Sequence, residues 1–376
     1  MKKDMVVQKF GGSSVASPEK IRAVAEFIKN SLVSRKRICV VVSAMGHSTN
    51  ELINMAHQIN PSPPKREMDM LISCGERSSM ALLAMALSHI DVKAISLTGS
   101  QSGIITDENH SGAEIVAIRP NRVLEAFREH EVVIIAGFQG VSRAREITTL
   151  KRGGSDTTAV AMAAALGARA CEIYSDVSGV MDADPRVLKH AQPITELSHE
   201  NMCSMSLYGA KVLAHDAATI AKELGVSLLI AEAGAASGTL IHEKIIKKEP
   251  KLVSAISHLR GVIRVSMDSC IEGQVHFLCG GIKEGQLYGY ASNDIAQELP
   301  VTSETNRGLA LITLQLGDRA LLPKTISLLK TVLSQKNIVL IEAIIGFGEL
   351  FVVINDEHLN LALNSLHDVL MRGEQL

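Results

Sequence analysis

Short runs rich in valine and isoleucine alternate with amphipathic segments from the amino terminus to about residue 240. This alternation is typical of a parallel sheet with helices on its faces. The expected strands are Met5–Phe10, Ile38–Ser43, Lys93–Leu97, Val132–Ala136, Cys171–Ser175 and Ser227–Ala231. The expected helices are Pro18–Leu32, Glu67–His89, Arg122–Glu129, Asp156–Leu166 and His215–Leu224. The sequence therefore predicts an α/β fold, an α/β/α sandwich with a mostly parallel sheet.

The pattern of strand and helix signals changes beyond residue 250, which predicts further domains. The chain has 376 residues, which is more than one hydrophobic core normally serves. A charged segment ending in Pro250-Lys251 reads as a linker. Strand and helix signals then follow in the order β-α-β-β-α, typical of a small α+β module, at residues 309–316, 323–336, 338–343, 350–354 and 358–370. We expect domains at 1–245, 252–306 and 307–376; the middle one has strand-like runs at 261–267, 275–279 and 286–290 and no clear helix.

Composition argues against several classes of protein. With 38 Lys and Arg against 40 Asp and Glu, and only 3% aromatic residues without Trp, a nucleic-acid-binding surface is disfavoured. The sequence has neither an apolar leader segment nor a long uncharged apolar run, so we expect no membrane span. The six cysteines form no C-x-x-C pair and several lie in apolar runs. These features favour a cytoplasmic globular protein with reduced thiols.

Three clusters of small or charged residues follow strand-like runs: Lys9–Ser14, Arg152–Asp156 and Asp182–Arg186. Glycine pairs let backbone N–H groups approach a phosphate, and a following helix amino terminus adds partial positive charge. Ser17 and Pro18 supply such a helix start. Neither the P-loop nor the G-x-G-x-x-G spacing is present in the first cluster. The clusters predict a phosphate-handling site of a different kind.

The chemistry of these clusters is electrostatic. The 13 histidines lack metal-ligand spacing and no Ser-His-Asp or Cys-His pattern occurs, so the sequence predicts neither a metal site nor a covalent nucleophile. Cationic and acidic residues at glycine loops suit phosphoryl transfer, in which positioning and charge neutralisation dominate. Singly, Lys9, Arg152 and Asp156 have plainer explanations as surface or capping residues. Their joint position at strand ends favours a site, because ligands bind there in open α/β sheets.

Ordered motifs over the first two thirds of the chain resemble those of the aspartokinases of the amino-acid-kinase superfamily. They are Val7–Val15, Val42–Gly46 with Thr49-Asn50, Ser73–Glu76, Thr98–Gly103, Ala136–Gly140, Arg152–Thr157, Asp176–Val180, Ala183–Arg186 and Tyr208–Val212. The resemblance implies the amino-acid-kinase fold and ATP-dependent phosphorylation of the side-chain carboxylate of L-aspartate to 4-phospho-L-aspartate. This reaction is the first step of lysine, threonine and methionine biosynthesis.

The resemblance also implies roles for individual residues. Lys9 is expected to neutralise charge on the transferring phosphoryl group, with Asp156 orienting it. Arg152 is expected to hold the substrate α-carboxylate in a bidentate fork, and Glu76 to pair with the α-ammonium group. The further substrate contacts are Thr49 and Ser155. The implied nucleotide contacts are Lys9, Phe10, Gly11, Gly12, Ser13, Ser175, Asp176, Met181, Asp184, Pro185, Arg186 and Lys211, with Mg²⁺ held mainly by phosphates and water.

This chain departs from the family pattern at several positions. Lys151 stands where glycine is usual before the arginine, Met181 where an aromatic is common, and Ala214-His215-Asp216 replaces a His-Pro-Arg turn. Of the two ACT modules usual in the family, the second is recognisable and the first is shortened. We therefore expect a homodimer or higher homo-oligomer through this region, with weak or altered feedback control. Two alternatives stay open: a kinase of another amino-acid carboxylate such as glutamate, and a catalytically idle amino-acid-sensing paralogue.

Overall fold

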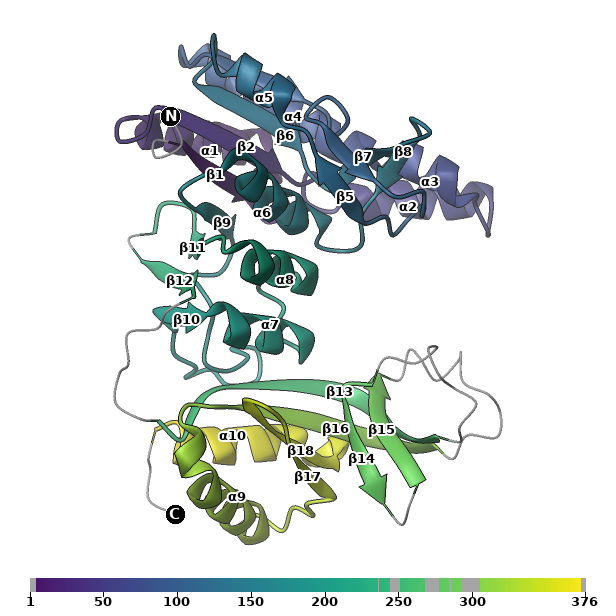
Figure 1. The fold of residues 1–376 in the computed structure, drawn as a ribbon, viewed down its shortest axis with the longest axis vertical. Coiled ribbons are helices and arrows are strands. Elements are labelled where there is room, and N and C mark those ends of the chain that lie inside the picture. The colour runs from purple at the N-terminus through teal and green to yellow at the C-terminus, as the bar shows by residue number, and fades with distance from the viewer. Residues whose placement is uncertain are drawn as a thin grey trace. The chain divides into compact units, whose positions relative to one another are not determined.

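The computed structural model describes residues 5–235, 237–243, 251–267, 277–283, 286–292 and 305–372 (Figure 1). The chain forms two compact units, and each takes up separate stretches of sequence. Unit 1 consists of Met1–Val180, Ile194–Cys203 and Val212–Ile245. Unit 2 consists of Met181–Pro193, Ser204–Lys211 and Ile246–Leu376.

Unit 1 is built on an eight-stranded sheet with the strand order β10-β12-β11-β9-β1-β2-β6-β3. All neighbouring pairs are parallel except β11 with β12. The bounds are β1 Met5–Phe10, β2 Arg37–Val42, β3 Ala94–Leu97, β6 Val132–Ala136, β9 Cys171–Ser175, β10 Glu196–Ser198, β11 Leu228–Glu232 and β12 Gly238–His242. The six predicted strands are all present, to within one residue at each end, and β10 and β12 extend the sheet.

Helices cover the sheet of unit 1 (Figure 1). Helices α1 (Pro18–Leu32) and α4 (Cys74–His89) pack together against β1, β2 and β6 in one hydrophobic core. Helix α6 (Gly154–Leu166) packs against β1, β2 and β9, with α8 (His215–Leu224) beside it. Strands β1 and β6 are buried at every residue, and β2 and β9 at all but one end residue, which explains their largely apolar sequences. The predicted mostly parallel α/β fold is confirmed.

The helix expected at Glu67–His89 is two helices, α3 (Lys65–Ile72) and α4, which meet at Ser73. The side chain of Gln139 donates a hydrogen bond to the Ser73 carbonyl, which interrupts the helical ladder at this residue. The whole stretch Lys65–His89 is long and apolar enough to span a membrane by length and composition. In this fold its residues Leu83 and Leu87 are fully buried against the sheet, as in a core helix.

A second, four-stranded sheet and one helix of unit 1 carry no clear sequence signal. The sheet has the order β5-β4-β7-β8, from Ile115–Ile118, Ile104–Thr106, Gln139–Ser142 and Ile147–Thr149. Strands of three or four residues are too short to show an alternating pattern. Helix α2 (Ser48–Ile59) was not expected, and α5 (Asn121–Ala126) ends before the expected Glu129.

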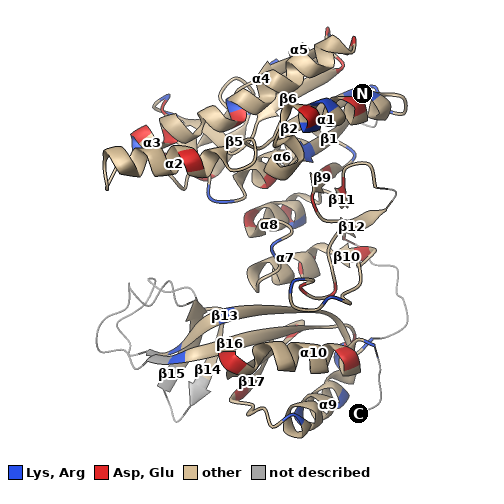
Figure 2. Ribbon diagram, turned by 180° about the vertical axis from the view of Figure 1, so that it is seen from behind, with Lys and Arg blue, Asp and Glu red and all other residues tan. Residues whose placement is uncertain are grey.

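Unit 2 contains a six-stranded antiparallel sheet, β14-β15-β13-β16-β18-β17, and the helices α9 and α10. The bounds are β13 Val253–Met267, β14 Cys279–Lys283, β15 Gln286–Ser292, β16 Thr305–Leu316, α9 Leu322–Gln335, β17 Glu342–Ile345, β18 Glu349–Asn355 and α10 Leu359–Leu370. Both helices pack on one face of the sheet (Figure 2). The expected α+β order of the last module is present, and helix α7 (His199–Leu207) joins stretches of the two units.

Two predicted strands of unit 2 need correction. The strand expected at residues 338–343 is β17, which begins at Glu342, because Ile338 instead packs into the core after α9. The strand expected at 261–267 is the second half of β13, which starts at Val253. The run expected at 275–279 begins outside the described residues. Because β13, β15 and β16 share one sheet, the boundary between residues 252–306 and 307–376 stays a prediction.

Candidate active site

The loop after β1 approaches the loop after β2 so closely that glycine is required. A Cβ atom on Gly12 would lie 2.8 Å from the carbonyl oxygen of Ala44. The Gly46 N–H donates to the Gly12 carbonyl at 3.0 Å, which fixes this approach. A single 3₁₀ turn, Gly12–Val15, leads to α1, where the Ser17 side chain accepts a hydrogen bond from the Lys20 N–H as expected of a cap. This arrangement leaves backbone N–H groups near the end of β1 free of side-chain obstruction.

Lys9 in β1 and Asp156 in the first turn of α6 form a buried ion pair. Their Nζ and Oδ1 atoms are 2.6 Å apart, and the two side chains are 10% and 11% exposed. The other carboxylate oxygen of Asp156 accepts a hydrogen bond from the Ala214 N–H at 3.4 Å. Gly153 precedes α6 with a φ of 83°, and a Cβ there would lie 2.5 Å from the Ala214 side chain. The divergent turn at Ala214 therefore helps to hold the carboxylate that pairs with Lys9.

One cavity of about 590 Å³ brings most of the predicted residues of unit 1 together. Its lining includes Lys9, Gly12, Thr49, Glu76, Arg152, Ser155 and Asp156. This volume falls in the range of small-molecule sites. Ser155 reaches the cavity wall past Gly137, where a Cβ would lie 2.8 Å from the serine hydroxyl oxygen. Residues from β1, α2, α4 and the start of α6 thus converge as the strand-end argument predicts.

Arg152 provides an exposed positive charge at this cavity. Within the part of the chain that the structure describes, its guanidinium forms no ion pair, so it is available to a ligand. The neighbouring Lys151 instead binds the Glu114 carboxylate at 2.9 Å, and this hydrogen bond raises the pKa of Lys151. The extra charge of Lys151 is thus neutralised locally.

Glu76 in the first turn of α4 is a buried carboxyl group at the same cavity. It is 3% exposed, and burial raises its pKa to about 7. The Ala44 N–H donates to its Oε1 at 3.2 Å, whereas its Oε2 has no hydrogen-bond partner among the described residues. A positively charged ligand group would satisfy this oxygen and favour the ionised carboxylate.

Asp69 was missed by the sequence analysis although it supports the cavity wall. Fully buried in α3, it accepts hydrogen bonds from the Thr149 hydroxyl at 2.5 Å and the Ser111 N–H at 3.0 Å, and lies 2.7 Å from His110 Nδ1. Ser111 and Thr149 both line the cavity. The helical spacing of the sequence indicated this burial, because Asp69 and Ile72 are three residues apart and share the buried face of α3.

The predicted nucleotide contacts are divided between the units. In unit 1, Ser175 is the last residue of β9 and Asp176 follows it. The other predicted contacts belong to unit 2: Met181, Asp184, Pro185, Arg186 and Lys211. Phe10 is fully buried and stacks on Tyr174 with ring centroids 5.3 Å apart, so its side chain is a core residue and only its backbone is left for a ligand. The structure brings Lys9, Phe10, Gly11, Gly12 and Ser13 together at the loop after β1.

Within unit 2, Asp184 and Arg186 form a preorganised pair. The guanidinium donates to both carboxylate oxygens of Asp184, at 2.9 and 2.7 Å, which lowers the pKa of Asp184. His258 of β13 was not predicted from the sequence. It lies close enough to Asp184, Arg186 and Lys211 for their charges to influence its pKa. Burial lowers the pKa of His258 and favours its neutral form.

Comparisons with known proteins agree with this architecture. Residues 4–232 match the model of the amino acid kinase family. An aspartokinase of Mycolicibacterium smegmatis is 45% identical over 267 residues, covering 70% of this chain and 63% of the relative. The chain thus spans less than two thirds of the length of the curated relatives it matches first.

Solved structures of aspartate kinases resemble this fold. E. coli aspartokinase III in complex with aspartate and ADP has a TM-score of 0.82 at 22% identity, covering 97% of this chain and 99% of that one. Aspartate kinase from Synechocystis has a TM-score of 0.59 at 32% identity, covering 97% and 69%. The family model, the parallel α/β unit and the ordered motifs lead to one assignment: the chain belongs to the amino acid kinase family.

Proposed function

We propose that this protein is an aspartate kinase, which transfers the γ-phosphoryl group of ATP to the side-chain carboxylate of L-aspartate. The observation that carries the proposal is the single cavity shared by Lys9, Glu76 and Arg152. A buried carboxyl group and an exposed guanidinium suit the ammonium and carboxylate groups of an amino acid. The paired lysine suits a phosphoryl group. The similarity to curated aspartokinases favours aspartate as that amino acid.

The residues of the cavity divide the reaction between binding and charge neutralisation. Arg152 holds the α-carboxylate and Glu76 the α-ammonium group, while Thr49 and Ser155 contact the substrate. An oxygen of the side-chain carboxylate forms a bond to the γ-phosphorus as the bond from that phosphorus to the bridging oxygen of ADP breaks. The attacking carboxylate is already ionised at pH 7, so no proton acceptor is needed. Lys9, kept in place by Asp156, neutralises charge on the transferring group.

The loop after β1 suits the phosphates of ATP, because Gly12 lines the same cavity as Lys9 and has no side chain to cover the backbone there. We assign Gly11, Gly12 and Ser13 to the phosphates, and Ser175, Asp176, Met181, Asp184, Pro185, Arg186 and Lys211 to the rest of the nucleotide. Mg²⁺ bound to the phosphates would supply further charge neutralisation.

The cysteines and the exposed apolar side chains indicate where the protein works and how it assembles. Among the described residues Cys39, Cys74, Cys171, Cys203 and Cys279 form no disulfide, which favours a reducing, cytoplasmic environment. A homodimer or higher oligomer through the C-terminal region is supported by the exposed apolar side chains of Val339, Ile345 and Phe347, near the edge strand β17. The chain's mass in solution, measured by light scattering, tests this assembly.

The activity itself is tested by trapping the acyl phosphate with hydroxylamine. We expect hydroxamate formation that depends on ATP and aspartate, with glutamate at least tenfold less efficient as judged by kcat/KM. Hydroxamate from glutamate alone would point to the kinase of another amino acid, and no hydroxamate from any amino acid to the idle sensing paralogue. Adding lysine, threonine or methionine to the same assay tests the expected weak feedback control.

The buried Glu76 predicts a pH dependence. Its pKa of about 7 in the free protein lies above the ordinary 4.5, so ionisation at neutral pH costs folding free energy, and stability declines as pH rises from about 4.5 to about 7. Only the ionised form pairs with ammonium. We therefore expect kcat/KM for aspartate to fall about tenfold for each pH unit below about 7. The Glu76→Gln variant should be less active, and its kcat/KM should not show this fall below pH 7. If the variant keeps the pH profile of the parent, Glu76 does not bind the ammonium group of aspartate.

A further inference from the structure

The segment Met181–Pro193, which carries Asp184 and Arg186, is anchored inside unit 2. The Ile256 N–H of β13 donates to the Asp182 carbonyl at 2.7 Å. Apolar side chains of the segment share one core with α9, α10 and the sheet; they are Ala183, Leu188 and Ala191. The segment therefore lies directly against the C-terminal helix.

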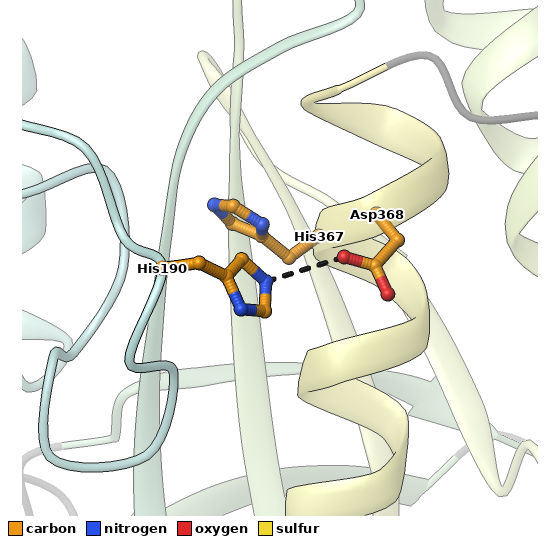
Figure 3. Close-up of side chains that lie close together, drawn as sticks. All are labelled: His190, His367 and Asp368. Atoms are coloured by element: carbon orange, nitrogen blue, oxygen red, sulfur yellow. Dashed lines mark ion pairs between the residues drawn. The ribbon is translucent and has the colours of Figure 1, made fainter.

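Three metal-ligating side chains meet at this contact (Figure 3). His190 comes from the segment, and His367 and Asp368 come from α10; one ligand atom of each lies within 4.8 Å of the others. His190 Nε2 is 3.2 Å from Asp368 Oδ1, and the two imidazole ring centroids are 5.2 Å apart. Two ligand atoms of a tetrahedral zinc site with bonds of about 2.0 Å are about 3.3 Å apart. The His190–Asp368 pair already has this spacing.

His367 is the buried member of the cluster, with a side chain that is 1% exposed. Its Nε2 has only an ion-pair contact to the Asp182 carboxylate, and its Nδ1 has no polar partner among the described residues. A buried polar group without a partner costs free energy, so such groups are normally satisfied by protein, water or an ion. Figure 3 shows the His367 ring lying next to that of His190. The unsatisfied imidazole thus points to a missing ligand between them.

Asp182 provides the outer contact that metal-binding histidines usually have. Its Oδ2 lies 3.2 Å from His367 Nε2, while its Oδ1 accepts a hydrogen bond from the Gln192 N–H at 2.8 Å. With Nε2 facing this carboxylate, Nδ1 of His367 is the nitrogen left for a cation. Asp182 would then fix the ring orientation, as in carboxylate–histidine–zinc arrangements.

We propose that His190, His367 and Asp368 bind a divalent late first-row metal ion, best matched by Zn²⁺, with water in the fourth position. Two imidazoles and one carboxylate suit zinc, whereas Mg²⁺ and Ca²⁺ prefer oxygen ligands, so this ion is distinct from the Mg²⁺ of a nucleotide. The guanidinium of Arg372 lies 3.8 Å from Oδ1 of Asp368, on the same helix end. The ion links α10 to the segment Met181–Pro193. The proposed function, on which this link to the nucleotide rests, places that segment at the nucleotide.

The test is direct binding of Zn²⁺ and Co²⁺ to the purified full chain without substrate, so that its outcome does not depend on the kinase activity. We expect one saturable site, visible absorption of bound Co²⁺ without thiolate bands, and a higher Tm with metal. His190→Gln and Asp368→Asn should weaken binding at least tenfold. His190 is partly exposed, so its variant is expected to fold. His358→Gln, which changes a histidine beside α10 but outside the cluster, is the matched control and should bind like the parent chain.

Three results would overturn the proposal. Failure of the full chain to bind either ion saturably would mean that the cluster consists of histidine–aspartate ion pairs only. Equal binding by the parent chain, His190→Gln and Asp368→Asn would assign the metal to other side chains. Thiolate bands in the Co²⁺ spectrum would point to a cysteine such as the exposed Cys74 and likewise exclude this cluster.

Discussion

Lys9→Met is expected to lower kcat for acyl-phosphate formation about a thousandfold, because the charge that meets the transferring phosphoryl group is lost from a buried position. The KM for aspartate should change far less, since Arg152 and Glu76 still hold that substrate. Steady-state kinetics with hydroxylamine trapping measure both constants. Lys36→Met is the control, because Lys36 is an exposed lysine of unit 1 outside the cavity and its variant should keep full activity.

The stability of the Lys9 variant separates catalysis from folding. Removing the lysine leaves the Asp156 carboxylate buried without its ion-pair partner, which costs on the order of 3–5 kcal/mol. The double variant Lys9→Met/Asp156→Asn should recover much of the lost Tm but none of the lost kcat. A folded Lys9→Met protein with near-parent turnover would refute the role assigned to Lys9.

Arg152→Ala is expected to reduce kcat/KM for aspartate about a hundredfold, as two charge-assisted hydrogen bonds to the α-carboxylate disappear. The main change should be in the KM for aspartate, with the KM for ATP nearly constant. Arg152→Lys should recover only part of the loss, because an ammonium group lacks the bidentate geometry.

Lys151→Ala is the matched control for Arg152, since it removes a neighbouring positive charge that Glu114 already binds. Exposed ion pairs contribute little, so this variant should stay within about twofold of the parent. Unchanged aspartate saturation in Arg152→Ala would contradict the substrate assignment and reopen the choice of amino acid.

The sequence was most informative where local pattern and burial coincide. Strands β1, β6 and β9 lie where they were predicted, because each is buried on both faces and reads as a short apolar run between polar turns. The convergence of Lys9 with Arg152 followed from the rule that strand ends of a parallel sheet share one edge. The short strands of the second sheet had too few residues to form a pattern.

Contacts between distant residues could not be predicted. The histidines looked scattered, yet the fold brings His190 and His367 together from a loop and a helix at opposite ends of unit 2's sequence. His258 lies inside a long strand with no motif around it, so nothing local marked it. Asp69 was partly predictable. The helical periodicity of α3 places this polar residue on the buried face of the helix, but it does not identify the residues that Asp69 contacts.

The burial of Ala183, Leu188 and Ala191 among the side chains of α9 and α10 bears on where this protein can be cut. The family match ends near residue 232, which invites truncation there. Such a fragment would keep Asp184 and Arg186 but would lose the apolar core beneath them, leaving Ala183, Leu188 and Ala191 exposed to solvent. The C-terminal module is thus part of the scaffold of the earlier segment and not an appendage to it.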